Sequence, residues 1–279
     1  MKDKAILITG CSSGIGLAAA LTLQERGYKV IASCRQEKDV SLLQQRGLQY
    51  VILLDLSNSD SIQNAVEQVL GICEGRLYAL FNNAAYGLPG AVEDLTRDAL
   101  RRQFETNVFG THELTCRLLP ILLGQSDARI IQNSSVLGVV AMYNRGAYVA
   151  SKFALEGLTD TLRLELADTA VKVSLIEPGP IMSRFRQNAL RHFEQDIDIE
   201  NSRHKKMYQQ GLERMKKQGP SMRFTLPASA VVDKLVHALE SPRPKPRYYV
   251  TFPTYFIGYL KRLLPTRGLD WVVRKLGSA

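Results

Sequence analysis

Cysteine and histidine are scarce in this chain of 279 residues, and neither is spaced to build a cross-linked or metal-bound fold. The four histidines show no metal-ligand spacing, and the four cysteines contain no CxxC pair. We therefore expect free thiols, a reducing compartment and no metal. The cysteines are Cys11, Cys34, Cys73 and Cys116.

Long apolar runs are also missing. No stretch reaches the roughly 18 consecutive apolar residues that a membrane-spanning helix requires. The first apolar stretch, residues 5–8, is too short for the core of a signal peptide and leads directly into Thr9 and Gly10. Together with the free thiols, these features predict a cytoplasmic protein.

Acidic residues are outnumbered, because 36 Lys and Arg stand against 27 Asp and Glu, which gives a net charge of +9. Such a balance suits an anionic partner, for example a phosphorylated cofactor or an acidic membrane surface, and equally suits an ordinary basic surface. No nucleic-acid-binding motif accompanies the charge, so we expect no nucleic-acid partner.

Apolar runs alternate with helix-length amphipathic segments along the chain. This alternation predicts one α/β domain, a doubly wound parallel sheet of the Rossmann type with helices on both faces. Ligands of such sheets bind at the carboxyl ends of the strands. The expected strands are residues 6–9, 28–32, 50–54, 78–82, 130–134 and 171–177, and the expected helices include residues 15–26, 59–72, 97–123 and 148–167.

A glycine-rich turn joins the first expected strand to the first expected helix. Gly10 allows the tight turn, Gly14 lets the backbone approach a pyrophosphate, and Gly16 allows the helix to pack closely on the strand. The free N–H groups at the start of that helix favour phosphate. The turn consists of Thr9, Gly10, Cys11, Ser12, Ser13, Gly14, Ile15 and Gly16.

This turn resembles the cofactor turn of short-chain dehydrogenases/reductases, and the similarity in motif order extends over roughly residues 4–180. Asp55 matches the adenine-contacting aspartate of that family. The run from Asn82 to Ala85 matches its NNAG motif, with Ala85 in place of the usual glycine, a change that we expect to be tolerated. The resemblance implies a cofactor site formed by Gly10, Ser12, Ser13, Gly14, Ile15, Gly16, Arg35, Asp55, Leu56, Asn83, Ala84, Tyr148, Lys152, Pro178, Gly179 and Ser183.

The end of the second expected strand indicates which nicotinamide cofactor is bound. NAD-selective sites usually place a carboxylate there to accept from the ribose 2′-hydroxyl. This chain has no carboxylate before Glu37 and carries Arg35 instead, which can bind a 2′-phosphate in a bidentate manner. Ser12 could donate a further hydrogen bond, whereas a solvated Arg35 is the alternative. We therefore predict NADP(H).

Three residues predict the chemistry. Tyr148 and Lys152 are four apart on an expected helix and share one face, and Ser135 precedes Tyr148 by thirteen residues, just after a strand. Reduction of a carbonyl needs a proton donor, and a nearby ammonium lowers the pKa of a tyrosine toward neutral pH. Ser135 can hold the substrate oxygen. In the family that the chain resembles, Asn107 matches an asparagine that interrupts a helix and positions a water for proton relay.

Residues 181–226, which we name the lid segment, are rich in charge and carry scattered Met and aromatic residues. The family uses this region as a mobile lid over the substrate, and such side chains suit an apolar pocket, although they could equally pack only the lid helices. Leu137, Met142, Tyr143 and Ile181 are the expected substrate contacts. The chain is similar in texture to bacterial NADP-dependent aldehyde reductases and to retinol and 17β-hydroxysteroid dehydrogenases. This implies an apolar aldehyde, ketone or alcohol as substrate, and a homodimer formed through the helices that begin near residues 97 and 148.

Residues 1–250 are expected to form the catalytic domain, and residues 251–279 an amphipathic basic segment. Phe256, Ile257, Leu260, Leu263 and Leu264 follow one helical stripe, which Pro265 ends. Leu269, Val272, Val273 and Leu276 repeat the pattern on a second helix. The stripes could cover the substrate pocket or a dimer interface, or could contact a membrane surface. A silent NADP-binding module is the alternative to an enzyme, and the presence of both Tyr148 and Lys152 argues against it.

Overall fold

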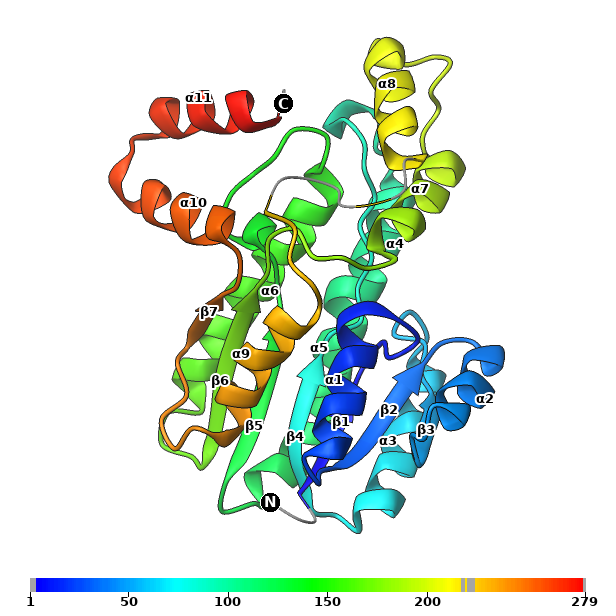
Figure 1. Cartoon of the computed structure of the whole chain (residues 1–279), viewed down its shortest axis with the longest axis vertical. Coiled ribbons are helices and arrows are strands. Elements are labelled where there is room, and N and C mark those ends of the chain that lie inside the picture. The colour runs from blue at the N-terminus through cyan, green and yellow to red at the C-terminus, as the bar shows by residue number, and fades with distance from the viewer. Residues whose placement is uncertain (1–3, 217–218, 220–223, 278–279) are drawn as a thin grey trace.

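The computed structural model describes residues 4–216, 219 and 224–277, and within them the chain forms one parallel sheet flanked by helices (Figure 1). The strand order is β3-β2-β1-β4-β5-β6-β7, with all neighbouring pairs parallel. The predicted doubly wound sheet is thus confirmed. The strands are β1 Ala5–Ile8, β2 Lys29–Cys34, β3 Tyr50–Leu53, β4 Leu77–Asn82, β5 Ala128–Asn133, β6 Val171–Glu177 and β7 Arg247–Tyr249.

Two hydrophobic cores cover the two faces of the sheet. Along β1, Ile6 and Ile8 face one core while Leu7 faces the other, as the alternation of side chains in a strand requires. The helices on the first face are α1 Gly14–Glu25, α2 Glu37–Gln45 and α9 Ser229–Glu240. Those on the second are α3 Ser59–Cys73, α5 Gly110–Leu123 and α6 Gly146–Glu165. Both faces are buried, which explains why the strands consist of nearly continuous apolar runs.

The single helix expected over residues 97–123 is in fact interrupted. It consists of α4 Arg97–Phe104, a π-helical turn η2 Glu105–Phe109, and α5. The extra residue per turn brings Gly110 against the loop that follows β3. A Cβ on Gly110 would lie 1.7 Å from the Leu56 carbonyl oxygen in that loop. This close approach requires a glycine, and the π-helical turn that precedes it carries Asn107.

The lid segment stands above the carboxyl ends of the strands and contains α7 Phe185–Asp196 and α8 Lys205–Lys216 (Figure 1). Its two ends are tied together, because Ile181 forms an isolated parallel bridge with Leu226. Met182 donates its backbone N–H to the Leu226 carbonyl at 2.9 Å. The bridge places the base of the lid segment at the residues where the sequence predicts its limits.

Two further helices, α10 Phe252–Leu263 and α11 Thr266–Gly277, follow β7 on the other side of the same end of the sheet (Figure 1). The predicted stripe on α10 is only partly correct. Ile257 is buried, but Leu263 is 78% exposed and Phe256 is 45% exposed. The inward face is set instead by Thr254, Ile257 and Gly258, because Gly258 packs directly on the Tyr249 ring. Leu276 lies in α11, but its side chain is outside the described residues.

Candidate active site

Ser135, Tyr148 and Lys152 converge at the carboxyl end of β5. Ser135 begins the short 3-10 turn η3 Val136–Gly138, and its Oγ accepts the Leu137 N–H at 3.1 Å. Tyr148 lies in the first turn of α6 with 8% of its surface exposed, and its hydroxyl is hydrogen-bonded to Ser135. Lys152 follows one turn later, with Nζ 5.7 Å from the centroid of the Tyr148 ring. A group held by Ser135 would therefore meet the Tyr148 hydroxyl.

Burial dominates the titration of both residues on α6. It raises the pKa of Tyr148 to about 12, against the hydrogen bond from Ser135 that lowers it. It also lowers the pKa of Lys152 to about 8, against the charge of Glu156 that raises it. Lys152 Nζ donates to the Asn133 carbonyl at 2.7 Å. At neutral pH the structure thus holds a protonated tyrosine beside a charged lysine.

Asn107 lies inside the π-helical turn, as the resemblance implied for a helix-interrupting residue. Its Nδ2 donates to the Tyr86 carbonyl at 2.9 Å and to Ser151 Oγ at 3.1 Å, and its Oδ1 accepts the Tyr86 N–H. The side chain therefore fixes the loop after β4 to α6. A water relay would have to use the main chain of this turn, because the amide is occupied.

The glycine-rich turn is held in place by Thr9, which the predicted site did not include, and by Asn83, which it did. Thr9 Oγ1 accepts the N–H groups of Asn83 and Ala84, both at 2.9 Å. Asn83 Nδ2 donates to the carbonyls of Thr9 and Gly10. A Cβ on Gly16 would lie 2.3 Å from the Gly10 carbonyl oxygen and 2.7 Å from Asn83 Nδ2. Gly16 is therefore required by this contact, and Asn83 supports the turn with its side chain.

The start of α1 fits a phosphate. Ser13 is its N-cap but makes no side-chain cap, and the first turn holds no acidic residue, so the N–H groups there stay available to an anion. Ser12 is exposed beside them and Ile15 is half-buried. Gly14 has a left-handed φ of 61°, and a Cβ there would lie 3.0 Å from the Ser183 Cβ. Ser183 thus brings the lid segment over the turn.

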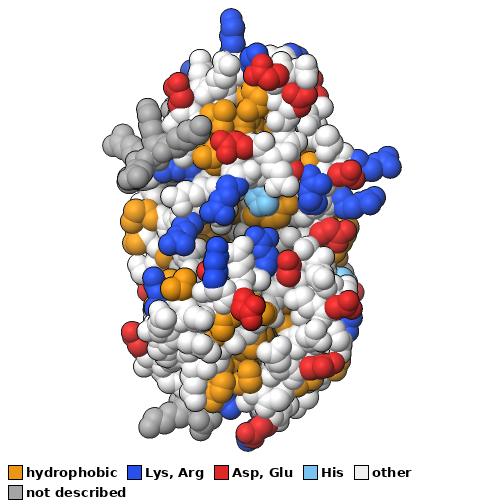
Figure 2. Space-filling view, turned by 90° about the vertical axis from the view of Figure 1, so that its right-hand side faces the viewer, with side chains coloured by type: hydrophobic (Ala, Val, Ile, Leu, Met, Phe, Trp, Pro, Cys, Tyr) orange, Lys and Arg blue, Asp and Glu red, His pale blue; other side chains and the backbone are white. Residues whose placement is uncertain are grey.

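Arg35, directly after β2, is exposed and forms no ion pair with any residue in the described part of the chain. It contributes to a positive region shared with the lid segment. Burial chiefly lowers the pKa of His192 on α7, and the charges of Arg35, Arg191 and Arg102 lower it further, against Asp196. Figure 2 shows Lys and Arg side chains gathered around a histidine at mid-height on the face turned to the right in Figure 1.

Asp55 holds the loop after β3 with one of its carboxylate oxygens. Its Oδ1 accepts the Ser57 N–H at 2.9 Å and the Ser57 hydroxyl at 2.7 Å, which shapes the loop after β3. The next residue, Leu56, is buried in the second core. These two residues therefore fix the loop after β3 at the carboxyl edge of the sheet.

The Pro178-Gly179 segment connects the reaction centre to the C-terminal helices. The Pro178 carbonyl accepts the Val136 N–H at 2.8 Å, next to Ser135. On its other side, a Cβ on Gly179 would lie 2.1 Å from Thr251 Oγ1 and 2.9 Å from Thr254 Oγ1. The start of α10 therefore packs directly on the segment that resembles the nicotinamide contact of the family.

An apolar cluster surrounds Tyr148, and it contains some of the expected substrate contacts. Leu137 is buried in it and Met142 packs against it, together with Ile257 of α10 and the partly buried Leu269 and Val273 of α11. Phe185 of the lid segment makes an edge contact with the Tyr148 ring, with centroids 5.4 Å apart. The C-terminal helices thus contribute side chains to the cluster around Tyr148.

The other two expected substrate contacts lie elsewhere. Tyr143 is 62% exposed and makes an edge contact with His204, whose ring centroid is 6.5 Å away. Ile181 packs against the core on the α1 and α9 face and pairs with Leu226. Neither residue belongs to the cluster around Tyr148. Tyr143 lies in an exposed loop, and Ile181 is held by its bridge to Leu226.

The model of the short chain dehydrogenase family matches residues 4–194, more than half of the chain. The chain belongs to the short-chain dehydrogenase/reductase family. An oxidoreductase of Escherichia coli called YbbO, itself uncharacterized, is 43% identical over 98% of this chain and 94% of its own length. Human retinol dehydrogenase 5 is 40% identical over 62% of this chain and 55% of its own. A solved family member from Burkholderia phymatum in complex with NAD has a TM-score of 0.77 and 26% identity, covering 94% of this chain and 92% of that one.

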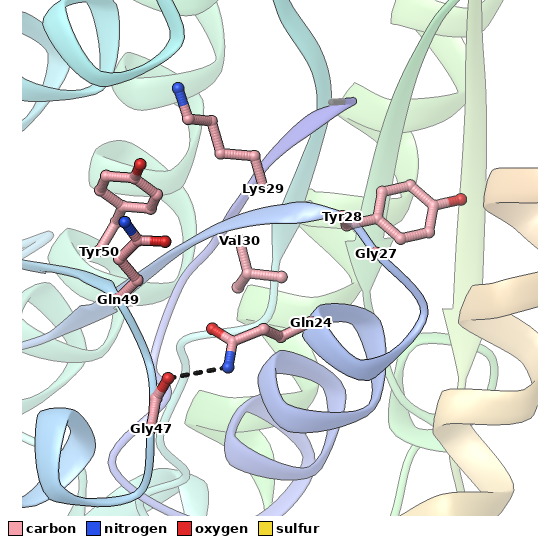
Figure 3. Close-up of a pocket in the computed structure, with 8 residues that line it drawn as sticks. All are labelled: Gln24, Gly27, Tyr28, Lys29, Val30, Gly47, Gln49 and Tyr50. Atoms are coloured by element: carbon pink, nitrogen blue, oxygen red, sulfur yellow. Dashed lines mark hydrogen bonds between the residues drawn. The ribbon is translucent and has the colours of Figure 1, made fainter. Parts of the chain in front are cut away.

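A separate pocket of about 330 Å³ lies at the opposite, amino end of the strands of this dehydrogenase (Figure 3). Gln24 donates a hydrogen bond to the Gly47 carbonyl across it at 2.8 Å, and Lys29 Nζ donates one to the Ile72 carbonyl at 2.7 Å. Ligands of doubly wound sheets bind at the carboxyl ends, so this pocket is not the reaction site. Among the described residues no cluster of three or more His, Cys, Asp and Glu could hold a metal, and no helix is long and apolar enough to cross a membrane.

Proposed function

We propose that this short-chain dehydrogenase/reductase transfers a hydride between NADP(H) and an apolar aldehyde or ketone, or the corresponding alcohol. The observation that carries the proposal is the convergence of Ser135, Tyr148 and Lys152 inside an apolar cluster. A polar trio in a water-poor site is suited to proton transfer to a carbonyl oxygen. The family supports an oxidoreductase, and the substrate class and cofactor are our inference.

The residues present fit a dinucleotide phosphate. The glycine turn leaves no room for side chains at Gly10 and Gly16, and the N–H groups of the first turn of α1 carry no side-chain cap. When bound there, NADPH would supply the hydride. The guanidinium of Arg35, which pairs with no acid that the structure describes, supports binding of its 2′-phosphate, and Arg191 adds positive charge from the lid segment. The Burkholderia phymatum protein is in complex with NAD, so similarity to it does not favour NADP. Our choice of NADP(H) rests on Arg35.

The chain's own groups would then act in order. Ser135 would hold the substrate oxygen and keep it next to Tyr148, whose hydroxyl is protonated at neutral pH and gives its proton to that oxygen. Lys152, charged below about pH 8, would stabilise the resulting phenolate. Leu137, Ile257 and the surrounding apolar side chains exclude water and select an apolar substrate.

The test is NADPH consumption by the purified chain with a panel of aldehydes, retinoids and keto-steroids, with Tyr148→Phe as control. We expect turnover with apolar members of the panel and none in the control. No turnover with any member, while NADPH still binds, would favour the silent cofactor-binding module instead.

A second role is supported by the outward face of the C-terminal helices. Phe252, Tyr259, Leu263 and Trp271 are all more than half exposed. Five basic residues, Lys261, Arg262, Arg267, Arg274 and Lys275, lie among them against one acid, Asp270. Rings beside positive charge suit peripheral contact with an anionic membrane surface. Liposome co-sedimentation at low salt tests this role, and absence of binding by the intact protein would exclude it, because screening is weakest there.

We also infer a homodimer formed through α4, α5 and α6. Several large apolar side chains on these helices are exposed, including Leu123 of α5 and Leu164 of α6, as is Phe109 of η2 between α4 and α5. Adjacent exposed apolar side chains of this kind mark protein–protein interfaces. Light scattering tests the inference, and Leu164→Glu is expected to shift the protein toward a monomer.

A further inference from the structure

A buried ionic cluster lies directly behind Lys152. Glu156, one turn further along α6, is 5% exposed, and Glu177, the last residue of β6, is 0% exposed. Arg247, the first residue of β7, donates to the carboxylates of both. Its second terminal nitrogen donates to Asp160 Oδ2 at 2.6 Å, nearer the surface. Two desolvated carboxyl groups therefore face one guanidinium.

Burial disfavours the ionised form of both glutamates. Glu156 Oε1 and Glu177 Oε2 are buried, and neither accepts a hydrogen bond from any residue that the structure describes. Burial raises the pKa of Glu156, against the Ser134 hydroxyl and Arg247. Burial and the charge of Glu156 raise the pKa of Glu177 to about 8, again against Arg247. Burial and the repulsion between two carboxylates on one guanidinium therefore favour a proton held by the pair.

Lys152 lies one helical turn before Glu156 on α6. It is 2% exposed, and burial lowers its pKa. The groups that face it are the neutral Asn133 carbonyl from the end of β5, the Tyr148 ring from α6, and Glu156 on its own helix. Of these only Glu156 supplies negative charge, and it raises the pKa of Lys152. Residues four apart on a helix lie on one face, so the charge of Glu156 acts on Lys152 from the next turn of α6.

We propose that Glu156 is a positioning residue of the active site, the counter-charge that keeps Lys152 protonated, and that Glu177 regulates it by competing for the proton that the two carboxyl groups share. When the proton is on Glu177, Glu156 is ionised and Lys152 holds its charge. When the proton is on Glu156, Lys152 loses its support. Arg247 holds both carboxyl groups in place. The inference rests on the proposed reductase activity, because that activity requires Lys152 as an ammonium beside Tyr148.

The two glutamates should respond oppositely to neutralisation. In Glu156→Gln the counter-charge is lost, so the pKa of Lys152 should fall by about one pH unit or more, a tenfold change in the ratio of charged to neutral lysine. In Glu177→Gln the competing carboxyl is lost and Glu156 stays ionised, so the pKa of Lys152 should stay or rise. Loosened packing alone would move both variants in the same direction.

The pKa of Lys152 can be measured without turnover. Protein labelled with ¹³C at lysine Cε is titrated by NMR, and the Lys152 signal is assigned by its loss in Lys152→Arg. Glu165→Gln, which removes an exposed carboxylate from the same helix, serves as the matched control and should leave the signal unchanged. A second readout is the alkaline limb of kcat/KM for reduction, which should move to lower pH in Glu156→Gln only.

An unchanged pKa in a folded Glu156→Gln, or a fall of the pKa in Glu177→Gln, would overturn the proposal. If Glu156→Gln does not fold, as judged by circular dichroism, Glu156→Asp replaces it. That variant keeps the charge and should keep the Lys152 pKa close to that of the parent, and a fall of one unit would count against the proposal. Failure of the reductase activity would leave the NMR result standing, so the two outcomes are distinguishable.

Discussion

Replacing Tyr148 by phenylalanine separates chemistry from packing at the reaction centre. The change removes one hydroxyl, whose partner in the structure is Ser135, and leaves the ring in the apolar cluster and against Phe185. Loss of one hydrogen bond costs about 0.5–1.5 kcal/mol of folding free energy. Loss of a general acid lowers turnover about 10²- to 10⁴-fold, which is about 2.7–5.5 kcal/mol in the activation barrier. Activity should therefore fall far more than stability.

Three measurements decide this prediction. Thermal unfolding should show a folded variant with only a small loss of stability. NADPH fluorescence should show cofactor affinity close to that of the parent, because the glycine turn and Arg35 are untouched. Single-turnover NADPH oxidation should be at most about a hundredth of the parent rate. A variant that keeps more than about a tenth of kcat would refute the assignment of Tyr148 as proton donor.

Four further predictions follow from the same geometry. Arg35→Asp should weaken NADPH binding and shift preference toward NADH, while Arg46→Asp, an exposed control on the other end of α2, should not; equal kcat/KM for NADPH in all three proteins would show that Arg35 does not contact the phosphate. Catalytic efficiency should rise a few-fold per carbon along an aldehyde series, at about 0.8 kcal/mol per buried methylene, and a flat profile would contradict the apolar cluster. Deleting residues 252–279 should abolish activity or cause aggregation, because Ile257 covers Tyr148, and full activity of the truncated chain would refute that cover. Reduction should decline as the pH rises through about 8, where Lys152 loses its proton, and a rate that increases through this range would contradict the role of its charge.

The first six strands could be predicted because each is a mainly apolar run, and all of them except the edge strand β3 are largely buried. The seventh, β7, was not predicted. It is three residues long, begins with Arg247 and follows a proline-rich stretch, so no local pattern marks it. It forms because its backbone pairs with Leu175 and Ile176 of β6, and because Arg247 donates a hydrogen bond to Glu177. Such pairing depends on residues distant in sequence.

Among the site residues, Ser135, Tyr148 and Lys152 could be brought together in advance because a strand end and one helical face fix their relation. The interruption at Asn107 was implied by the family resemblance and not by a break in periodicity, and the contact of Gly110 with the Leu56 carbonyl that accompanies it joins residues distant in sequence. The misplaced face of α10 has a similar origin, since Gly258 packs on the Tyr249 ring and turns Phe256 outward. Thr9 is marked in the sequence only by its place before Gly10.

The contact of Gly179 with Thr251 and Thr254 has a consequence for the order in which the protein becomes competent during synthesis. The glycine turn, Ser135 and Tyr148 leave the ribosome well before α10 does. A nascent chain that already has its sheet from β3 to β6 still lacks Ile257, so the side of Tyr148 that this residue covers is open to water. We therefore expect the apolar cluster around Tyr148 to be complete only when the last helices have docked.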